Sequence, residues 1–399
     1  MRILQICKKF PYPPHDGEVI AILNLSKAFV ALGHTLDVLA LNTNKHHTDV
    51  SSVPKSLTEV IHFHHCDINT DVVWTKALAH ALLNQPYNVW RFYSEKFEQQ
   101  LIELLKLKTF DVIQIEGLPV LLYIDSIRKH SKAKIAYRAH NVEHEIWLRL
   151  LQHEHSFLKK NYYGLLAAQV KKFEMNAAKK VDLILPISLR DQLFFTSVGC
   201  TQSMHVVPAC IDDISIADSA PMLSQKDIFF LGALDWLPNQ EGLQWFIDRC
   251  LPLLIKEMPD IVLHIAGRHM PASFLEIKTK NIVVYGEVAH AQAFMQEKGL
   301  MIVPLLSGGG MRIKIIEAMM LQKAIVSTTI GAEGIQYTDG KNIAIADDAV
   351  TFCKAIITLL QDPMLQSNIA NEACVLSKQH YSSIAVATDL ISFYKAQLS

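Results

Sequence analysis

The chain has 399 residues, a formal net charge of −1 and a hydrophobic fraction of 50%. This length predicts one to three domains with sizeable cores, and the near-neutral charge argues against nucleic acid as the main partner. The longest apolar runs are short and broken by charged residues or glycine, so we expect no transmembrane helix. The seven cysteines are dispersed without a Cys-x-x-Cys motif, which is typical of reduced thiols in a cytoplasmic protein.

Short apolar runs rich in β-branched residues alternate with longer helical patterns along the whole chain. In the first half, strands are predicted at 2–7, 35–41, 60–65, 112–115, 134–139, 183–186 and 205–207. In the second half, they are predicted at 228–232, 262–266, 282–285, 300–304, 324–327 and 343–346. Strands that alternate with helices form βαβ units and parallel sheets, so we expect an α/β fold.

These strands are too many for one comfortable sheet, and the pattern restarts near Asp227. The polar segment 211–224 has no clear period and is predicted to be a linker. We therefore predict two doubly wound domains, one over residues 1–210 and the other over residues 225–380. Ligands of such domains bind beyond the carboxyl ends of the strands.

Basic residues are concentrated in the first half, where residues 1–200 carry five more basic than acidic side chains. In segment 156–180, lysines alternate with apolar and aromatic residues. Such a helix more often packs with a solvated basic face than it lies on a membrane surface, and both interpretations stay open. Trp236 and Trp245 are predicted to lie in the core. A second aromatic group is predicted mainly to pack in the core, with an acceptor groove as the less frequent alternative: Trp74, Trp90, Phe92, Tyr93 and Phe97.

The most informative segment covers residues 300–320. Its apolar start predicts a buried strand, three glycines follow at 308–310, and a helix is then expected with Arg312 and Lys314 in its first turn. Glycines let the backbone approach a ligand closely, and a helix N-terminus flanked by Arg and Lys binds anions. We therefore predict a diphosphate site here. The alternative is a tight strand-to-helix turn with a Lys314–Glu317 surface ion pair.

Segment 307–319 reads Ser-Gly-Gly-Gly-Met-Arg-Ile-Lys-Ile-Ile-Glu-Ala-Met. Together with the segments at 11–17, 137–147, 182–188, 230–246 and 330–335, it resembles the GT-B glycosyltransferases, specifically the retaining group 1 or family 4 enzymes. The resemblance implies two Rossmann-like domains facing across a cleft. A nucleotide sugar would bind mainly to the C-terminal domain and the acceptor to the N-terminal one, without a metal. A last helix at 382–397 would pack back on the first domain.

The resemblance implies roles for single residues on the donor side. Arg312 and Lys314 would hold the diphosphate as catalytic cations, and Glu317 would bind the ribose hydroxyls as the second Glu of the family's Glu-x7-Glu motif. Gly309 replaces the first Glu of that motif, so contacts to the donor sugar are expected from the loop backbone or elsewhere. The predicted donor-binding residues are Gly17, Gly308, Gly309, Gly310, Met311, Glu317 and Glu287.

On the acceptor side, His140 would line the donor sugar and is counted with the catalytic residues. Asp16, Glu18 and Asn141 are predicted to face the acceptor, although Glu18 stands where many relatives have a second glycine. Residues 140–144 also spell the inverted zinc-protease motif His-x-x-Glu-His. The first of these histidines directly follows a predicted strand, however, so we predict no metal site.

The predicted protein is thus a retaining, metal-independent glycosyltransferase of the hexosyltransferase type that uses a UDP- or GDP-sugar and no cofactor. It would act on a glycan or lipid-linked acceptor, and the resemblance implies surface polysaccharide assembly as the setting. Cations and N–H groups would stabilise the charge on the departing diphosphate. We expect a cytoplasmic location, with peripheral contact to the inner face of the membrane as an open option. The alternatives are an epimerase-like enzyme on the same fold and a non-catalytic nucleotide-sugar-binding protein.

Overall fold

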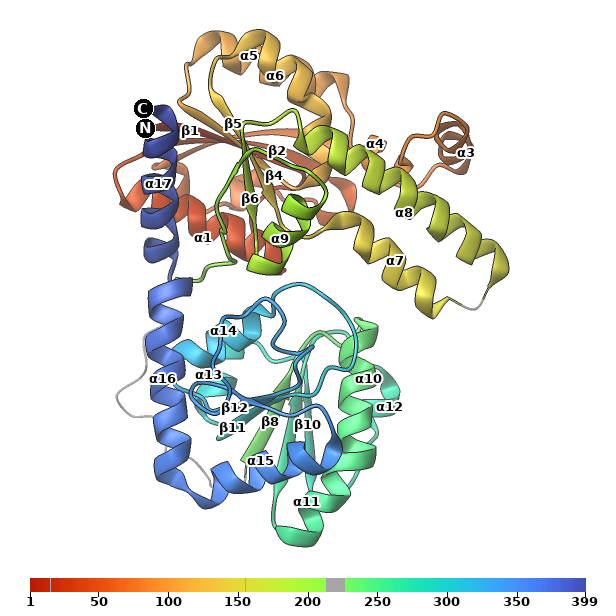
Figure 1. The fold of residues 1–399 in the computed structure, drawn as a ribbon, viewed down its shortest axis with the longest axis vertical. Helices are drawn as coiled ribbons and strands as arrows, with labels where there is room; N and C mark the ends of the chain where they lie inside the picture. Colours follow the sequence, from red (N-terminus) through yellow and green to blue (C-terminus); the bar gives the residue numbers. More distant parts are fainter. Residues whose placement is uncertain (15, 155, 213–226) are drawn as a thin grey trace. The chain divides into compact units, whose positions relative to one another are not determined.

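A computed structural model describes residues 1–14, 16–154, 156–212 and 227–399 (Figure 1). The chain divides into two compact units: an N-terminal unit of Met1–Cys210 with Ser383–Ser399, and a C-terminal unit of Ile211–Ser382. Each unit contains a parallel sheet whose strands alternate with helices, which confirms the predicted pair of doubly wound α/β folds. The predicted linker at 211–224 falls almost entirely outside the described residues.

In the described part of the N-terminal unit, seven parallel strands form one sheet in the order β3-β2-β1-β4-β5-β6-β7. They are β1 (Arg2–Cys7), β2 (Thr35–Thr43), β3 (Ile61–Ile68), β4 (Val112–Glu116), β5 (Lys134–Ala139), β6 (Leu183–Pro186) and β7 (Ser203–Met204). Strands covered on both faces read as continuous apolar runs, which explains why the sequence reveals them so clearly. The order reverses between β1 and β4, so a topological switch point lies at the carboxyl ends of these two strands.

Helices cover both faces of this sheet. One face packs against α1 and α17 through residues such as Ile22, Phe29 and Leu390, and the other face packs against α5, α6, α8 and α9. In α5, Ser94 caps the N-terminus by accepting a hydrogen bond from the Phe97 N–H group. The helices are α1 (Gly17–Ala31), α2 (Lys55–Thr58), α3 (Trp74–Leu82), α4 (Tyr87–Trp90), α5 (Glu95–Leu107), α6 (Ile124–His130), α7 (Glu143–His153), α8 (Phe157–Ala178), α9 (Leu189–Ser197) and α17 (Ser383–Leu398).

The described part of the C-terminal unit contains six parallel strands in the order β10-β9-β8-β11-β12-β13. They are β8 (Asp227–Leu231), β9 (Val262–Ala266), β10 (Ile282–Gly286), β11 (Leu300–Val303), β12 (Ile325–Ser327) and β13 (Ala344–Ile345). The helices are α10 (Leu237–Trp245), α11 (Leu251–Glu257), α12 (Ala272–Leu275), α13 (Ala291–Gln296), α14 (Ile313–Met320), α15 (Ala349–Gln361) and α16 (Pro363–Tyr381). Here the switch point lies between β8 and β11, next to the predicted glycine loop.

Two local predictions are wrong. The strand predicted at 205–207 is displaced, because β7 covers only Ser203–Met204. The N–H groups of His205 and Val207 still donate to carbonyl oxygens of β6, at 3.1 and 2.8 Å. The helix after the glycine loop begins at Ile313, so Arg312 is its N-cap residue in extended backbone conformation and does not belong to its first turn.

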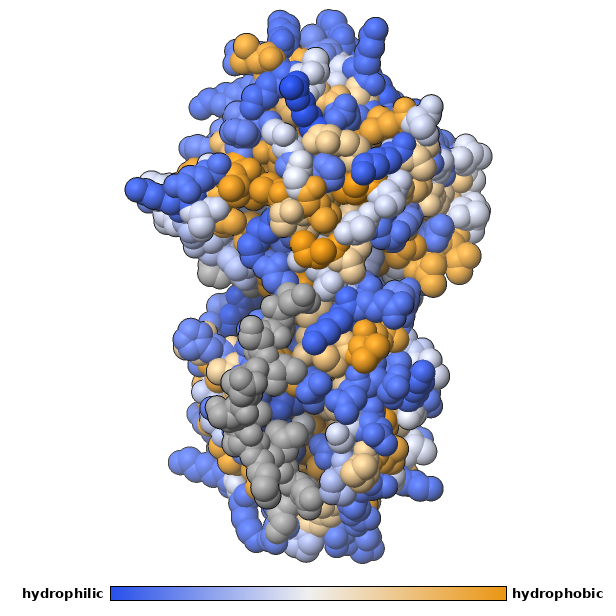
Figure 2. All heavy atoms as spheres, turned by 90° about the vertical axis from the view of Figure 1, so that its left-hand side faces the viewer, coloured by the Kyte–Doolittle hydropathy of each residue, from blue (hydrophilic) through white to orange (hydrophobic). Residues whose placement is uncertain are grey.

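The surface is mixed in character. Figure 2 shows hydrophobic and hydrophilic side chains interspersed on the visible surface of each unit. Scattered apolar residues are normal on the surface of a folded protein. Among the described residues, no helix has the length and hydropathy needed to span a bilayer.

Candidate functional site

The glycine loop of the C-terminal unit connects β11 to α14 and starts at the switch point. Gly308 and Gly310 have φ values of +102° and +83°, a region that residues with a side chain rarely adopt. A Cβ atom at Gly308 would lie 2.7 Å from the ring of Trp236, which follows β8. Glycine is therefore required at position 308 both for its backbone conformation and for the close approach of the indole.

Arg312 is held against this loop by several contacts. Its guanidinium carbon lies 4.9 Å from the centre of the Trp236 ring, a cation–π arrangement. Its Nη1 donates to the carbonyl oxygen of Gly309 at 2.6 Å and also to that of Gly310. The side chain thus folds back over the three glycines and places a positive charge beside the start of α14.

Helix α14 directs its first N–H groups toward the same loop. Arg312 makes no side-chain capping bond at this end, and unpaired N–H groups at a helix N-terminus attract anions. Lys314 lies in the first turn and pairs with the buried Glu317 at 2.5 Å. The predicted Lys314–Glu317 ion pair is therefore present in the structure. It engages the carboxylate that is also predicted to bind the ribose hydroxyls.

Other loops at the same edge of the sheet approach the glycine loop. The Ser307 hydroxyl donates to Glu241 of α10 at 2.9 Å, and the Cα of Met311 would lie 3.6 Å from a Cβ atom on Gly334. Glu287 is exposed at the carboxyl end of β10, and in the sheet order β9 and β8 separate its strand from the loop. The structure thus gathers the predicted donor residues of this unit at one edge of the sheet, with Glu287 the most distant in strand order.

In the N-terminal unit, a buried polar network lies at the ends of β4 and β5. The Nε2 atom of His140 is 2.7 Å from Oε2 of Glu116, and an Arg138 nitrogen lies 3.7 Å from the same carboxylate oxygen. Burial acts to raise the pKa of the Glu116 carboxyl, but Arg138 and His140 outweigh it, so that this pKa is lowered. Glu116 therefore stays ionised and fixes the orientation of the His140 ring.

A second cluster of charges surrounds the end of β1 and the start of α1. Lys8 lies 3.1 Å from Glu18 and 3.8 Å from Glu143, and Lys9 lies 2.7 Å from Asp16. Burial raises the pKa of Glu143, with Glu174 and Glu18 adding to the effect and Lys8 opposing it. Glu18 is turned toward the two lysines, and its Oε1 atom is buried with no hydrogen-bond partner among the residues that the structure describes.

We expect Glu18→Gln to make the protein less stable at pH 7 by about 2–3 kcal/mol. Burial acts to raise the pKa of Glu18, but the charges of Lys8 and Lys9 outweigh it and lower this pKa from its usual 4.5 to about 2. A lowered folded-state pKa stabilises the fold above the unfolded-state pKa, and this stabilisation disappears as the pH falls through the folded-state pKa. Urea unfolding from pH 7 to pH 3 should therefore show a difference between the two proteins that shrinks below about pH 4.5.

The matched control for this experiment is Glu103→Gln, which changes an exposed carboxylate on α5. It should alter the free energy of unfolding by less than about 0.5 kcal/mol. An unchanged stability of the Glu18 variant at pH 7 would contradict the ion-pair assignment.

The other predicted site residues of this unit, the donor-side Gly17 and the acceptor-side Asp16 and Asn141, lie near these two clusters in the chain. Asp16 caps α1 by accepting from the Val19 N–H group, Gly17 is the first residue of that helix, and Asn141 follows His140 in the chain. His144 lies on α7 and contacts Glu174 at 2.8 Å, whereas His140 precedes that helix. The zinc-protease interpretation is therefore wrong, and no group of metal-binding side chains is found in the part of the chain that the structure describes.

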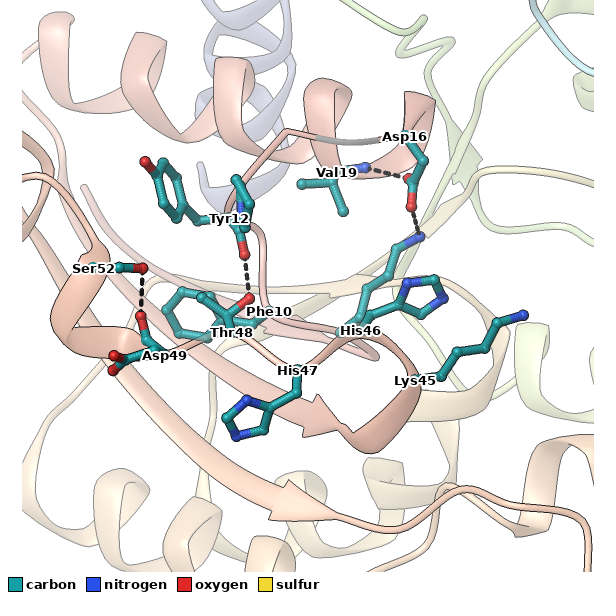
Figure 3. Close-up of a pocket in the computed structure, with 12 residues that line it drawn as sticks. Phe10, Tyr12, Asp16, Val19, Lys45, His46, His47, Thr48, Asp49 and Ser52 are labelled. Carbon is teal, nitrogen blue, oxygen red and sulfur yellow. Dashed lines mark hydrogen bonds and ion pairs between the residues drawn. The ribbon is translucent and has the colours of Figure 1, made fainter. Parts of the chain in front are cut away.

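A pocket of about 360 Å³ lies beside the carboxyl ends of β1 and β2 (Figure 3). Asp16 is at its edge, where it accepts hydrogen bonds from Lys9 and from the Val19 N–H group. Burial, followed by the charge of Lys9, lowers the pKa of His46 in the wall of this pocket. The pocket thus combines cationic and aromatic side chains, and its further lining residues include Phe10, Tyr12, Lys45 and His47.

Sequence reasoning does not single out several residues of these sites. Trp236 was predicted to lie in the core but is half-buried against Gly308 and Arg312, so that prediction is wrong; Trp245 does pack against the core. Glu116 is also missed. The available signal was position: Glu116 ends β4 and Trp236 lies in the loop after β8, and both strands adjoin a switch point.

Comparisons with known proteins now add to this geometry. Residues 225–362 match the family model described as "Glycosyl transferases group 1". A curated relative, an uncharacterised 44.6 kDa protein in the cps region of Klebsiella pneumoniae, is 28% identical over 98% of both chains.

Solved structures share the fold along nearly the whole chain. Anabaena HepE in complex with UDP has a TM-score of 0.68 at 13% identity, covering 99% of this chain and 100% of that one. Sucrose-phosphate synthase from Thermosynechococcus elongatus has a TM-score of 0.70 at 13% identity, covering 100% and 99%. The expected fold is confirmed: the chain shares the GT-B fold of these proteins, and residues 225–362 match the model of the group 1 glycosyltransferases that the sequence resembles.

Proposed function

We propose that the protein is a retaining glycosyltransferase of the hexosyltransferase type that transfers a sugar from a UDP-sugar to a glycan or lipid-linked acceptor. The observation that carries this proposal is the glycine loop, where Arg312, the first N–H groups of α14 and the glycine backbone lie together at a switch point. Such a set of cations and N–H dipoles stabilises negative charge on a departing diphosphate. Solved structures of HepE that contain UDP and UDP-glucose favour a uridine donor over a GDP-sugar.

In this proposal, each unit has its own part. The diphosphate binds at Arg312 and the N-terminus of α14, where Lys314 adds a positive charge. When the donor binds, Glu317 leaves its ion pair with Lys314 and accepts hydrogen bonds from the ribose hydroxyls. In the N-terminal unit, Glu116 holds the His140 ring, and Asp16, Glu18 and the neighbouring pocket receive the acceptor.

The setting we propose is surface polysaccharide assembly in the cytoplasm, at the inner face of the membrane. It is supported by the Klebsiella pneumoniae relative, which is described as a protein in the cps region.

A thermal-shift screen with nucleotide sugars tests the donor site. We expect a UDP-sugar at about 100 times its dissociation constant to stabilise the protein by about 2.7 kcal/mol, which raises Tm by about 5–10 °C. Gly308→Ala should abolish this rise, because the added methyl group would displace the loop from Trp236. Gly340→Ala is the matched control: its φ is +71° but nothing lies within 4 Å of a Cβ atom there, so the rise should remain.

The same preparations distinguish catalysis from mere binding. The wild-type protein should release free UDP slowly from its donor without acceptor, and EDTA should leave this rate unchanged. A full Tm rise in Gly308→Ala would contradict the placement of the donor. A normal Tm rise without any UDP release would favour a non-catalytic binding protein, and strong inhibition by EDTA would contradict metal independence.

A further inference from the structure

Helix α3 of the N-terminal unit presents an apolar stripe to solvent. Trp74, Leu78 and Leu82 are spaced four residues apart and are 76%, 65% and 82% exposed. Residues at this spacing lie on one face of a helix, so the three side chains form a continuous strip. The expectation that Trp74 packs in the core is wrong. Contiguous exposed apolar patches on a folded protein mark interaction surfaces.

The opposite side of α3 holds the helix in place. Ala77 is buried, and the His80 ring stacks on Trp90 of α4 with 5.7 Å between the ring centres. The Ala81 carbonyl accepts a hydrogen bond of 3.4 Å from Gln169 of α8. The contacts that hold α3 in place therefore do not involve the exposed stripe. Its apolar side chains are free to bind another molecule.

The two segments that form the stripe and most of α8 carry basic but no acidic side chains. Segments 72–92 and 156–173, which include α3, α4 and most of α8, contain no Asp or Glu. The hydrogen bond between Gln169 and α3 joins the two regions, and Figure 1 shows α3 and the α7–α8 hairpin on the same side of the N-terminal unit. The cations of these segments are Lys76, Arg91, Lys159, Lys160, Lys171 and Lys172.

Aromatic and apolar side chains also accompany the lysines of α8. Phe157 opens the helix and is 77% exposed, and Tyr162 and Leu165 are exposed one and two turns later. Lys159 and Lys160, between them, are exposed as well. Exposed Trp, Phe and Leu next to lysines are the pattern of a surface that lies in the interface of a membrane.

We propose that the surface formed by α3 and the first two-thirds of α8, here called the α3–α8 surface, binds a membrane that contains anionic lipids. The apolar stripe enters the boundary between headgroups and acyl chains, and the lysines contact lipid phosphates. A protein partner would normally present both signs of charge, whereas six cations without an acidic residue complement a surface of uniform negative charge. The inference specifies the membrane contact within the proposed function, but it does not depend on the donor.

The test is flotation of the full-length protein with lipid vesicles. Vesicles containing about 30% phosphatidylglycerol should bind the protein at least about tenfold more tightly than vesicles of phosphatidylcholine alone. The triple variant Trp74→Ser, Leu78→Ser, Leu82→Ser should lose at least about tenfold in binding. Lys159→Gln with Lys160→Gln should reduce the preference for anionic lipid. The matched control, Leu107→Ser, changes a side chain on α5 that is 82% exposed and should bind like the wild type.

Three results would overturn the proposal: no binding by the wild type, equal binding by the triple variant, or equal binding to neutral vesicles. A dimer in solution that the triple variant converts to a monomer, without vesicle binding, would assign the stripe to a second copy of the chain instead. The Tm rise with a UDP-sugar should be the same in the triple variant and the wild type. If the wild type binds vesicles but shows no Tm rise with a UDP-sugar, the result would contradict the proposed function and leave the membrane surface standing.

Discussion

Arg312→Ala is expected to reduce kcat/KM for sugar transfer by about 10²–10³-fold, because one charge-stabilising group at a departing diphosphate has an effect of this size. The loss should appear in kcat as well as in kcat/KM, since the interaction strengthens in the transition state. The side chain contacts Trp236 and two glycine carbonyls, so Tm should fall by only a few degrees. Steady-state kinetics with a UDP-sugar, together with a melting curve, measures both quantities.

Two further variants sharpen this experiment. Arg249→Ala removes an exposed arginine from the same unit and should leave turnover unchanged. Arg312→Lys keeps the charge but loses the planar fork, so it should recover only part of the activity. Unchanged turnover in Arg312→Ala would remove this residue from the site.

Glu116→Ala is expected to destabilise the N-terminal unit by about 3–5 kcal/mol. The change leaves the guanidinium of Arg138, which is fully buried, without its carboxylate partner. For a unit of this size, that loss corresponds to a decrease in Tm of about 10 °C. It also releases His140 from its 2.7 Å contact, so transfer activity should fall in parallel. Urea unfolding at pH 7 gives the free energy.

The double variant Glu116→Ala with Arg138→Met tests the reason for this effect. If the cost comes from an unpaired buried charge, replacing Arg138 by an apolar side chain should recover at least about half of the lost stability. Glu59→Ala, at an exposed carboxylate, should change stability by less than about 0.5 kcal/mol. A double variant that is less stable than Glu116→Ala alone would contradict the explanation.

The strands were predictable because each is a local apolar run between helices. Val112–Glu116 and Leu300–Val303, for example, are buried along their whole length and occur where the sequence predicts them. The start of α14 was predicted less well. The φ of +83° at Gly310 continues the loop through Arg312, and no pattern in the residue types alone reveals this turn.

The partners of the site residues depended on sheet order. Trp236 and Gly308 are far apart in the sequence, but they meet because β8 and β11 are neighbours at the switch point. Glu116 and His140 meet in the same way, since β4 and β5 are adjacent. Their contact explains why a carboxylate can end a buried strand, which its sequence context leaves unexplained.

The sequence alone determined the α/β class, the glycine loop and the cationic segments, because these are properties of residues close together in the chain. The tertiary structure decided which strand ends meet, that Lys314 pairs with Glu317, and that the stripe of Trp74, Leu78 and Leu82 points to solvent. These outcomes depend on contacts between distant segments. An amphipathic helix such as α3 looks the same in the sequence whether its apolar face is covered or exposed, and only the packing of its opposite face on α4 and α8 shows which case holds.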